Sequence, residues 1–385
     1  MKKRPIYLDY QSTTPVDKRV LDEMLPYFSE KFGNANSKEH VYGWESEAAT
    51  DLARARIAKV INAKDSEIIF TSGATESNNL ALIGTANFYG QKKNHIITCI
   101  TEHKSIIETC KYLEKQGFNL TYLKVSTDGI IDLNELKNAI TENTLLVSIM
   151  AVNNEIGVIQ DLRNIGKICK DAQVFFHSDI AQAFGKIAIN VNEIGADLLS
   201  ISGHKIYGPK GIGALYIRNS PAIRLMPLLH GGGQELGLRS GTLATELIVG
   251  LGKASEISND EMLVEQKETL VKKELFYNLL KNNLPDIYLN GSEITRISGN
   301  LNISFSGIKS DKLISEIKGL AISSSSACAS GTAESSYVIK ALGYDQQRAK
   351  SSLRFSIGKP TTEEEIREAA NMVINAVNKL REKMV

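Results

Sequence analysis

The sequence predicts an α/β protein with a large domain, built on a mainly parallel, doubly wound sheet, and a smaller α+β domain. Between residues 67 and 217, short apolar runs alternate with segments of helical periodicity, as in a sheet covered by helices on both faces. From about residue 260 the pattern changes to a long amphipathic helix followed by further strands and helices. With 385 residues, of which 42% are hydrophobic, the chain can bury a core of this size.

The predicted division of the chain has three parts. Residues 1–15 form an N-terminal arm that belongs with the small domain, residues 16–258 form the large domain, and residues 259–385 form the small domain. Residues 5–45 are expected to be irregular, because turn-like segments recur there. Such arms commonly line an active site or a contact between subunits.

Strands and helices are expected in regular alternation after this arm. In the large domain, helices are predicted at 45–61, 76–83, 105–116, 133–139 and 162–171, and strands at 67–71, 96–100, 120–125, 145–151, 174–178, 198–202 and 214–217. In the small domain, helices are predicted at 262–280, 312–318, 337–342 and 363–380, and strands at 300–305 and 351–356.

Lys205 directly follows the predicted strand 198–202, in the motif Ser202-Gly203-His204-Lys205. Burial lowers the pKa of a lysine, and a neutral amine can condense with an aldehyde. A surface lysine at a strand end is the alternative. Asp179 ends another apolar strand, with Gln182 just beyond it, and ligands of open α/β sheets bind beyond the carboxyl ends of the strands. An aspartate there can keep a pyridine nitrogen protonated, which suggests pyridoxal phosphate.

A strand, a glycine-containing turn and a helix start meet at Ser72-Gly73-Ala74-Thr75. Free backbone N–H groups and the helix dipole make such a turn an anion site, although a plain N-cap also explains Thr75. The glycine-dense loop 231–242 ends at Thr242. This loop is either a simple connection or a second phosphate contact.

Three polar residues outside these motifs are candidates for the same site. His103 and Asn154 follow predicted strands, where a ring-stacking or proton-transferring group would lie, although a histidine there is often structural. Arg354 lies in the middle of an apolar strand. A buried guanidinium needs a partner, either a substrate carboxylate or a structural salt bridge.

The four cysteines, Cys99, Cys110, Cys169 and Cys328, show no paired spacing, which argues against disulfides and structural zinc. The first three lie in apolar or helical patterns and are expected to be packing residues. Cys328 lies in a loop of small polar residues at about 322–333. Such a loop cannot pack as core, so Cys328 is a candidate nucleophile.

Charge and hydropathy indicate a small-molecule partner. The net charge is +1, with acids and bases mixed throughout, so no nucleic-acid or membrane surface is indicated. The N-terminus lacks a signal-peptide core, and no apolar run reaches the roughly 20 residues of a membrane span. We therefore expect a cytoplasmic protein.

Taken together and in order, six motifs resemble those of the cysteine desulfurase family. The closest branch is that of NifS and IscS, among the class-V aminotransferase-like, fold-type I pyridoxal phosphate enzymes. The motifs are Ser72-Gly73-Ala74-Thr75, Thr101-Glu102-His103, Asn153-Asn154-Glu155, Ser202-Gly203-His204-Lys205, Arg239-Ser240-Gly241-Thr242 and Ser325-Ser326-Ala327-Cys328.

The resemblance implies a homodimer that takes sulfur from L-cysteine, releases L-alanine and holds the sulfur as a persulfide on Cys328. The sulfur would pass to acceptors, chiefly a scaffold protein for iron–sulfur cluster assembly, with tRNA thiolation as a further use. No intrinsic metal site is implied, although Cys328 could transiently ligate a cluster on the scaffold.

The resemblance also assigns roles to individual residues. Lys205 would carry pyridoxal phosphate as a Schiff base and move the substrate proton. Asp179 would hold the ring nitrogen, Gln182 would bond the ring hydroxyl, and His103 would stack on the ring and take part in catalysis. Asn154 would contact cofactor and substrate, and Arg354 the substrate carboxylate. The phosphate would be bound by Ala74, Thr75, Ser202 and His204, with Thr242 of the partner subunit.

The chain departs from the family pattern at Ser325 and Ser335, where relatives usually carry Gly and Pro, so the mobility of the loop could differ. Chains of this branch also continue into a tail that docks the scaffold, whereas this sequence ends at Val385, so the acceptor stays open. The alternatives are a selenocysteine lyase, a serine–pyruvate-type aminotransferase, and a non-catalytic sulfur-relay subunit. The two enzymes would need Lys205 but not Cys328.

Overall fold

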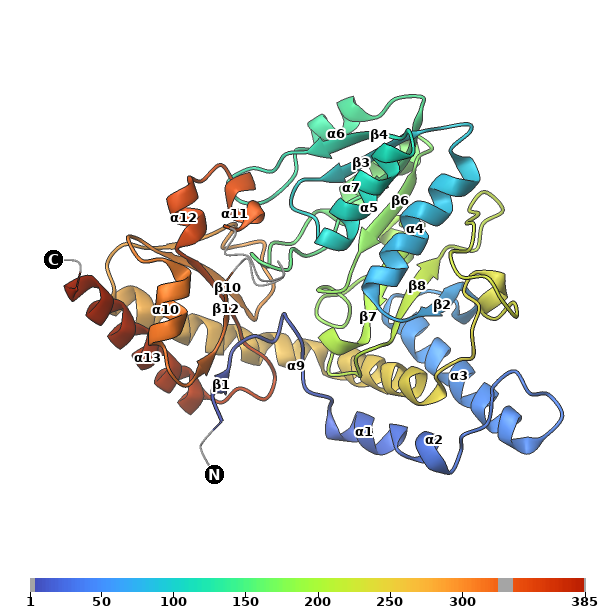
Figure 1. The fold of residues 1–385 in the computed structure, drawn as a ribbon, viewed down its shortest axis with the longest axis horizontal. Helices are drawn as coiled ribbons and strands as arrows, with labels where there is room; N and C mark the ends of the chain where they lie inside the picture. The colour runs from blue at the N-terminus through green and yellow to red at the C-terminus, as the bar shows by residue number, and fades with distance from the viewer. Residues whose placement is uncertain (1–3, 325–334, 384–385) are drawn as a thin grey trace.

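The computed structural model describes residues 4–324 and 335–383, and its largest element is a mainly parallel sheet of seven strands (Figure 1). The strand order is β2-β8-β7-β6-β5-β3-β4, and β8 runs antiparallel to both of its neighbours. This confirms the predicted class of fold. The strands are β2 (Ile68–Thr71), β3 (His95–Cys99), β4 (Asn119–Leu123), β5 (Thr144–Ser148), β6 (Phe175–Asp179), β7 (Leu198–Ser202) and β8 (Gly213–Ile217).

Both faces of this sheet are buried under helices. Because side chains alternate along a strand, Ile96 packs with α4 (Ala74–Tyr89) and α5 (Lys104–Lys115), whereas Ile97 packs with α3 (Val41–Val60) and α7 (Leu162–Asp171) on the other face. Two-sided burial explains why the strands are continuous apolar runs. The short helices α6 (Leu133–Ala139) and α8 (Val191–Ile194) complete this layer structure.

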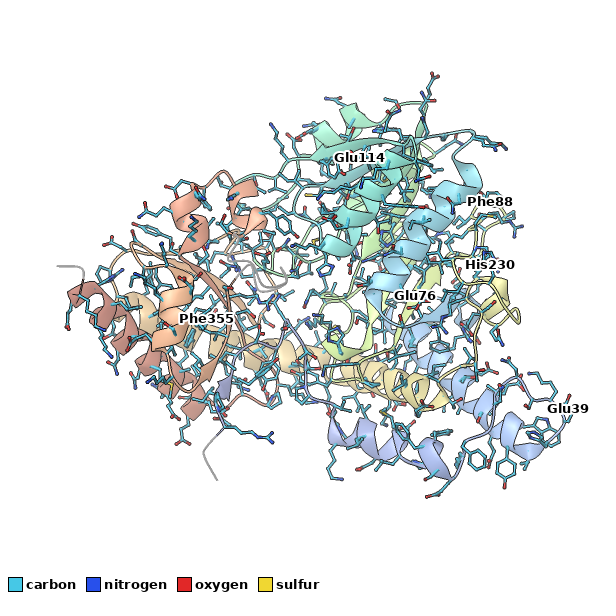
Figure 2. The ribbon with its side chains drawn as sticks, viewed as in Figure 1. Glu39, Glu76, Phe88, Glu114, His230 and Phe355 are labelled. Atoms are coloured by element: carbon cyan, nitrogen blue, oxygen red, sulfur yellow. The ribbon has the colours of Figure 1, made fainter. Side chains whose placement is uncertain are left out.

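A second, antiparallel sheet has the order β12-β13-β10-β9. Its core includes Phe355, labelled in Figure 2, which packs against Phe276 and Phe305. The predicted strands 300–305 and 351–356 are β10 and β13, whereas the short strands β9 and β12 were not predicted. The elements are β9 (Ile287–Leu289), β10 (Asn300–Phe305), β12 (Ser323–Ser324), β13 (Ser352–Ser356), α10 (Ser310–Glu316), α11 (Tyr337–Ala341), α12 (Gln346–Lys350) and α13 (Glu363–Glu382).

One helix, α9 (Thr245–Asn283), runs from the first sheet to the second (Figure 1). Ile248 and Leu251 near its start pack in the large core, and Phe276 and Leu280 near its end pack against the small sheet. The predicted boundary at residue 258 therefore falls inside a continuous helix. The division into domains stays a prediction.

The expectation of an irregular arm over residues 5–45 was wrong. The segment contains β1 (Ile6–Tyr7), which pairs in parallel with β11 (Leu320–Ala321), and the helices α1 (Lys18–Met24) and α2 (Pro26–Ser29). The side chain of Asp17 caps α1, and Pro26 stands in the first turn of α2. Tertiary packing of Val20 and Met24 in the large core stabilises α1, and local turn signals do not reveal it.

Cys99, Cys110 and Cys169 are buried and free, which confirms their predicted packing role. Burial raises the pKa of Cys99 and of Cys169 to about 12, and that of Cys110 further still. These three thiols are therefore poor nucleophiles. In the ranges 4–324 and 335–383, no helix has the length and apolar character needed to cross a bilayer.

Candidate active site

A cavity of about 580 Å³ opens at the carboxyl ends of β6 and β7 and reaches the small sheet. The N-terminal arm, the start of α4 and the N-terminus of α5 also line it. The cavity brings together most of the residues predicted for the site, namely Ala74, Thr75, His103, Asn154, Asp179, Gln182, Ser202, His204, Lys205 and Arg354.

Lys205 is half-buried, in the short 3₁₀ turn η2 (Gly203–Lys205) that follows β7. Its Nζ donates hydrogen bonds to the backbone oxygens of Gln11 and Ser12, both at 2.7 Å. The turn is tight, because a Cβ on Gly203 would lie 3.0 Å from the oxygen of Pro209. The amine thus lies at the cavity wall with two backbone partners, unlike a fully solvated surface lysine.

Asp179 ends β6 and is almost fully buried. Its Oδ2 accepts a hydrogen bond from Asn78 Nδ2 at 2.7 Å, and its Oδ1 accepts one from the backbone N–H of Ala181 at 2.9 Å. Donors on both oxygens suit an ionised carboxylate, which accepts but does not donate. A buried negative charge therefore faces the cavity.

His103 caps α5, and its Nδ1 accepts a hydrogen bond from the backbone N–H of Ser105 at 3.1 Å. Burial lowers the pKa of His103; the carboxylate of Asp179 opposes this shift, and Lys205 adds to it. The ring is thus neutral near pH 7. Because Nδ1 is the acceptor, the single ring proton lies on Nε2.

His204 is also neutral at this pH. Burial and the positive charges of Lys205 and Lys210 lower its pKa to about 4. Its Nδ1 lies 3.1 Å from the hydroxyl of Thr13. Its backbone oxygen accepts two hydrogen bonds from Thr14, both at 3.0 Å, so the N-terminal arm is fixed to the lysine turn.

The start of α4 has the backbone geometry expected of the anion site that the sequence predicts. Gly73, with φ of 150°, is the N-cap and makes no side-chain cap bond, so the alternative that Thr75 is the N-cap is wrong. The first N–H groups of a helix have no partner within it, and they carry the positive end of its dipole. These groups and the exposed hydroxyl of Thr75 are therefore available to a phosphate.

Glu76, labelled in Figure 2, is a carboxylate beside this anion site. Burial alone would raise its pKa, but hydrogen bonds from Arg239, at 3.0 Å, and from the backbone of Ser72, at 2.7 Å, hold it below the usual range. Arg239 belongs to the glycine-dense loop 231–242. Its guanidinium offsets a negative charge that would otherwise repel a bound anion.

Arg354 lies on β13 and is buried. It pairs with Asp9, Nη2 to Oδ1, at 2.7 Å and donates from Nη1 to the backbone oxygen of Asn154 at 2.8 Å. The salt bridge that was the alternative for this residue is therefore present. Yet Arg354 Nε and Asn154 Oδ1 are buried without a hydrogen-bond partner among the described residues, and such atoms usually have one.

Thr242 and Cys328 were also predicted to belong to the site at this cavity. Thr242 is exposed ahead of α9 and does not line it. Cys328 lies outside the described residues. The roles assigned to the site residues stay predictions.

Sequence reasoning missed Gln11, Ser12, Thr13 and Asn78, all of which lie at the site. A turn-like arm was expected to line a site, but local sequence does not show which carbonyl oxygens would meet Lys205. Asn78 did leave a signal, because it is a buried polar residue close to Leu80 and Ala81 on an apolar helix, and such a residue needs a partner.

Residues 6–368 match the family model described as Aminotransferase class-V. A cysteine desulfurase IscS of Rickettsia typhi is 58% identical over 377 residues, which are 98% of this chain and 92% of the relative. The chain belongs to the cysteine desulfurase family. Cysteine desulfurases depend on pyridoxal phosphate, and so does this member.

Solved structures of similar proteins agree with this membership. A NifS-like protein has a TM-score of 0.91 and 36% identity, covering 97% of this chain and 99% of its own. SspA in complex with cysteine has a TM-score of 0.83 and 38% identity, covering 92% of this chain and 99% of its own.

The cavity of this desulfurase fits the cofactor that the family uses. A helix N-terminus suits the phosphate, the carboxylate of Asp179 suits a protonated ring nitrogen, and Lys205 is the amine that an aldehyde needs. The buried Asn154 Oδ1 also faces no partner within the described chain, as expected of a ligand contact. Among the described residues, no group of His, Cys, Asp and Glu could hold a metal ion.

Proposed function

We propose that this chain removes sulfur from L-cysteine, releasing L-alanine and leaving a persulfide on Cys328. The observation that supports it best is the meeting of Lys205, Asp179 and Gln182 at one cavity beside a helix N-terminus. This donor set suits pyridoxal phosphate, and the chain belongs to a family of cysteine desulfurases.

Different residues would bind the phosphate, the ring nitrogen and the ring hydroxyl of the cofactor. Ala74, Thr75, Ser202 and His204 would hold the phosphate, and Thr242 of a second subunit would join them. Asp179 would hold the ring nitrogen, Gln182 the ring hydroxyl, and the neutral ring of His103 would stack on the cofactor. The bound cofactor supplies an electron sink for the substrate carbons.

The chain's own groups would then carry out the transfer of sulfur. Arg354 and Asn154 would hold the cysteine substrate, and Lys205 Nζ would take the proton from Cα and return protons to the carbon skeleton. The thiolate of Cys328 would attack the substrate sulfur. A new S–S bond forms as the Cβ–S bond breaks, the bonding pair stays with the carbon skeleton, and alanine leaves after protonation.

Replacement of Cys328 separates this reaction from its alternatives. We expect Cys328→Ser to keep the yellow colour of the bound cofactor but to form no persulfide, and Lys205→Ala to lose the normal visible band. Cys99→Ala, at a buried thiol, is the matched control and should keep activity. Full release of sulfur by Cys328→Ser would favour a selenocysteine lyase, and wild-type protein that binds no cofactor would favour a relay subunit.

We infer that the protein works as a homodimer. Large apolar side chains are exposed over α1, α2 and the start of α3, including Phe28 at 56%, Phe32 at 65% and Trp44 at 54%. A second copy would cover such a surface. Light scattering should give twice the mass of one chain; a monomer at working concentrations would exclude a contribution of Thr242 from a partner.

We also infer that the sulfur goes chiefly to an iron–sulfur scaffold in the cytoplasm, with tRNA thiolation as a further use. The similarity to proteins named IscS supports this destination. After loading with labelled cysteine, the enzyme should pass its label to the scaffold protein of its own cell. If the enzyme keeps its label when the scaffold protein is present but passes it to other proteins of the lysate, the scaffold is not the acceptor.

A further inference from the structure

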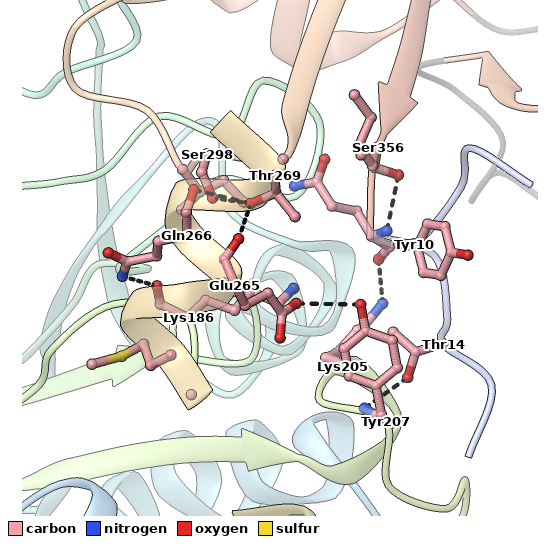
Figure 3. A pocket seen from close by; sticks show the side chains of 16 residues that line it. Tyr10, Thr14, Lys186, Lys205, Tyr207, Glu265, Gln266, Thr269, Ser298 and Ser356 are labelled. Carbon is pink, nitrogen blue, oxygen red and sulfur yellow. Dashed lines mark hydrogen bonds between the residues drawn. The ribbon is translucent and has the colours of Figure 1, made fainter. Parts of the chain in front are cut away.

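Lys186 lies behind the wall of the active-site cavity, in the turns that follow β6. Its Nζ donates a hydrogen bond to Gln182 Oε1 at 3.0 Å. Gln182 lines the large cavity, whereas Lys186 lines a separate small cavity of about 40 Å³ that also touches Lys205 (Figure 3). Because Lys186 does not line the large cavity, we expect it to act on the site through its hydrogen bond to Gln182 or through its charge.

The turns hold the two side chains in register. Phe184 N–H bonds to the oxygen of Ile180, and Ile187 N–H bonds to that of Ala183, so residues 182 and 186 lie one turn apart. Gly185 has φ of 68°, and a Cβ there would lie 2.7 Å from Cβ of Ser258 on α9. The side chain of Gln266 on α9 also bonds the backbone oxygen of Lys186.

The hydrogen bonds of Gln182 permit only one orientation of its amide. A lysine amine at neutral pH only donates, so the atom facing Lys186 must be the oxygen. At the other end the amide nitrogen donates to the backbone oxygen of Gln11 at 2.8 Å, and a carbonyl only accepts. The backbone oxygen of Gln11 also accepts a hydrogen bond from Lys205. One chain of hydrogen bonds therefore runs from Lys186 through Gln182 and Gln11 to Lys205.

Lys186 is mainly protonated at pH 7, because its lowered pKa is still above 7. Burial lowers its pKa to about 8; the carboxylate of Glu265 on α9 opposes this shift, and Arg354 on β13 adds to it. Figure 3 shows Lys186 and Glu265 at the same small cavity. Lys186 therefore remains a donor under working conditions.

We propose that Lys186 is a positioning residue that fixes the amide of Gln182 with its nitrogen toward the cofactor site. This inference rests on the proposed function, in which Gln182 bonds the ring hydroxyl. One N–H of the amide is used by Gln11, and the second is left for that hydroxyl oxygen. Donation to this oxygen stabilises its deprotonated form, so loss of the orientation should raise the pH at which the bound cofactor takes up a proton.

The test measures the visible absorbance of reconstituted protein against pH. In Lys186→Met, the midpoint should rise by roughly 0.5–1 pH unit, since a neutral hydrogen bond contributes about 0.5–1.5 kcal/mol. Release of pyridoxal phosphate should be roughly three- to tenfold faster. Lys186→Arg should restore both values, and Lys273→Met, at a half-buried lysine farther along α9, should change neither.

A double-mutant cycle separates positioning from the effect of charge, because the cofactor also senses Asp179, His103, His204, Lys205 and Arg354. In a Gln182→Leu background, Lys186→Met should cause no further shift. Equal shifts with and without Gln182, or an unchanged midpoint in Lys186→Met, would overturn the inference. Wild-type protein that never binds the cofactor would instead overturn the proposed function, so the two failures are distinct.

Discussion

Among the site residues, Arg354 has both structural partners and a donor that no described residue satisfies. It pairs with Asp9 and with the backbone of Asn154, yet its Nε lacks a partner within the described chain. A guanidinium held by one carboxylate is ordered but still has donors for another. The structural ion pair thus pre-orients the group that we expect to bind the substrate carboxylate.

Replacement of Arg354 by lysine tests this role. A lysine keeps the charge but loses the planar fork, so KM for cysteine should rise roughly ten- to a hundredfold, because hydrogen bonds to charged groups contribute about 1.5–3 kcal/mol. Steady-state kinetics of wild type and variant measure this change in KM. Asp9→Asn is the comparison, since it keeps the guanidinium and an oxygen that can accept its hydrogen bond, so it should raise KM much less than Arg354→Lys. An equal rise in both variants would mean that the pairing with Asp9, and not a contact of the guanidinium with the substrate, determines KM.

At the scale of residues, the sequence predicts the groups that carry chemistry better than those that hold them. Lys205, Asp179 and His103 follow strands, and strand ends meet in space by a general rule of open sheets. The partners of Lys205 are carbonyl oxygens of Gln11 and Ser12, and backbone atoms leave no mark in a residue pattern.

Among the elements, β8 and the turn before α4 are fitted closely to one another. Gly213 of β8 lies beside Gly73, and a Cβ at residue 213 would come 2.6 Å from Cα of Gly73 and 2.4 Å from the oxygen of Ile201. Both contacts are with backbone, which cannot rotate away. The shape of the phosphate turn therefore depends on a residue without a side chain in the neighbouring strand.

We expect Gly213→Ala to push this turn away and to weaken the binding of pyridoxal phosphate by roughly tenfold, with a loss of stability of about 1–3 kcal/mol. Equilibrium dialysis of the cofactor and thermal unfolding measure these effects. Gly343→Ala, at φ of 86° with open space around it, should cost stability without changing cofactor affinity. Normal affinity in Gly213→Ala would show that the turn tolerates displacement.

Elements with strong apolar runs were predicted nearly as they are found, and those fixed by tertiary contacts were not. The predicted segments 162–171, 198–202 and 300–305 match α7, β7 and β10. The N-terminal helix α1 and strand β1 were missed, since β1 has only two residues and its partner Leu320 is far away in sequence. Similarly, no local signal shows that α9 continues through residue 258.

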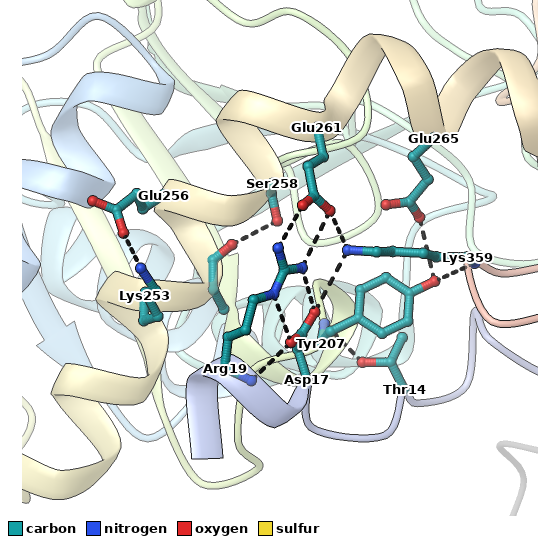
Figure 4. Close-up of polar contacts among 11 residues, drawn as sticks. Thr14, Asp17, Arg19, Tyr207, Lys253, Glu256, Ser258, Glu261, Glu265 and Lys359 are labelled. Carbon is teal, nitrogen blue, oxygen red and sulfur yellow. Dashed lines mark hydrogen bonds and ion pairs between the residues drawn. The ribbon is translucent and has the colours of Figure 1, made fainter. Parts of the chain in front are cut away.

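At the scale of the whole molecule, a cluster of charges joins three distant parts of the chain (Figure 4). Arg19 of α1 pairs with Glu261 of α9 at 2.6 Å and with Asp17 at 2.7 Å, and Lys359, beyond β13, pairs with both acids. Hydrogen bonds from Arg19 hold the pKa of Asp17 far below its usual range and lower that of Glu261 to about 2. The cluster thus links the N-terminal arm, the long helix and the small sheet.

Because of this cluster, the free energy of unfolding should depend on pH in the acidic range. The pKa of Glu261 is lower in the folded state than in the unfolded state. Its contribution to the free energy of unfolding is therefore complete above about pH 4.5 and is lost as the pH falls toward about 2. Glu261→Gln should cost about 1 kcal/mol at pH 7, since the groups are partly exposed, and the difference from wild type should shrink below pH 4.

Thermal unfolding at several pH values measures this difference. Glu268→Gln, on the same helix, is the matched control and should show almost no effect, because Glu268 is more exposed than Glu261 and its partner Lys272 lies 4.0 Å away. A constant difference between Glu261→Gln and wild type from pH 7 to pH 3 would contradict the pH dependence assigned to the ion pairs.

The transfer of one sulfur atom to Cys328 tests the central claim most directly. The reconstituted enzyme is given L-cysteine without a reductant, and the quenched protein is analysed by intact mass and peptide mapping, with alanine measured in the same sample. The account predicts one added sulfur atom on the peptide that contains Cys328 and one alanine for each sulfur bound. Alanine without added sulfur, or sulfur on another cysteine, would contradict it.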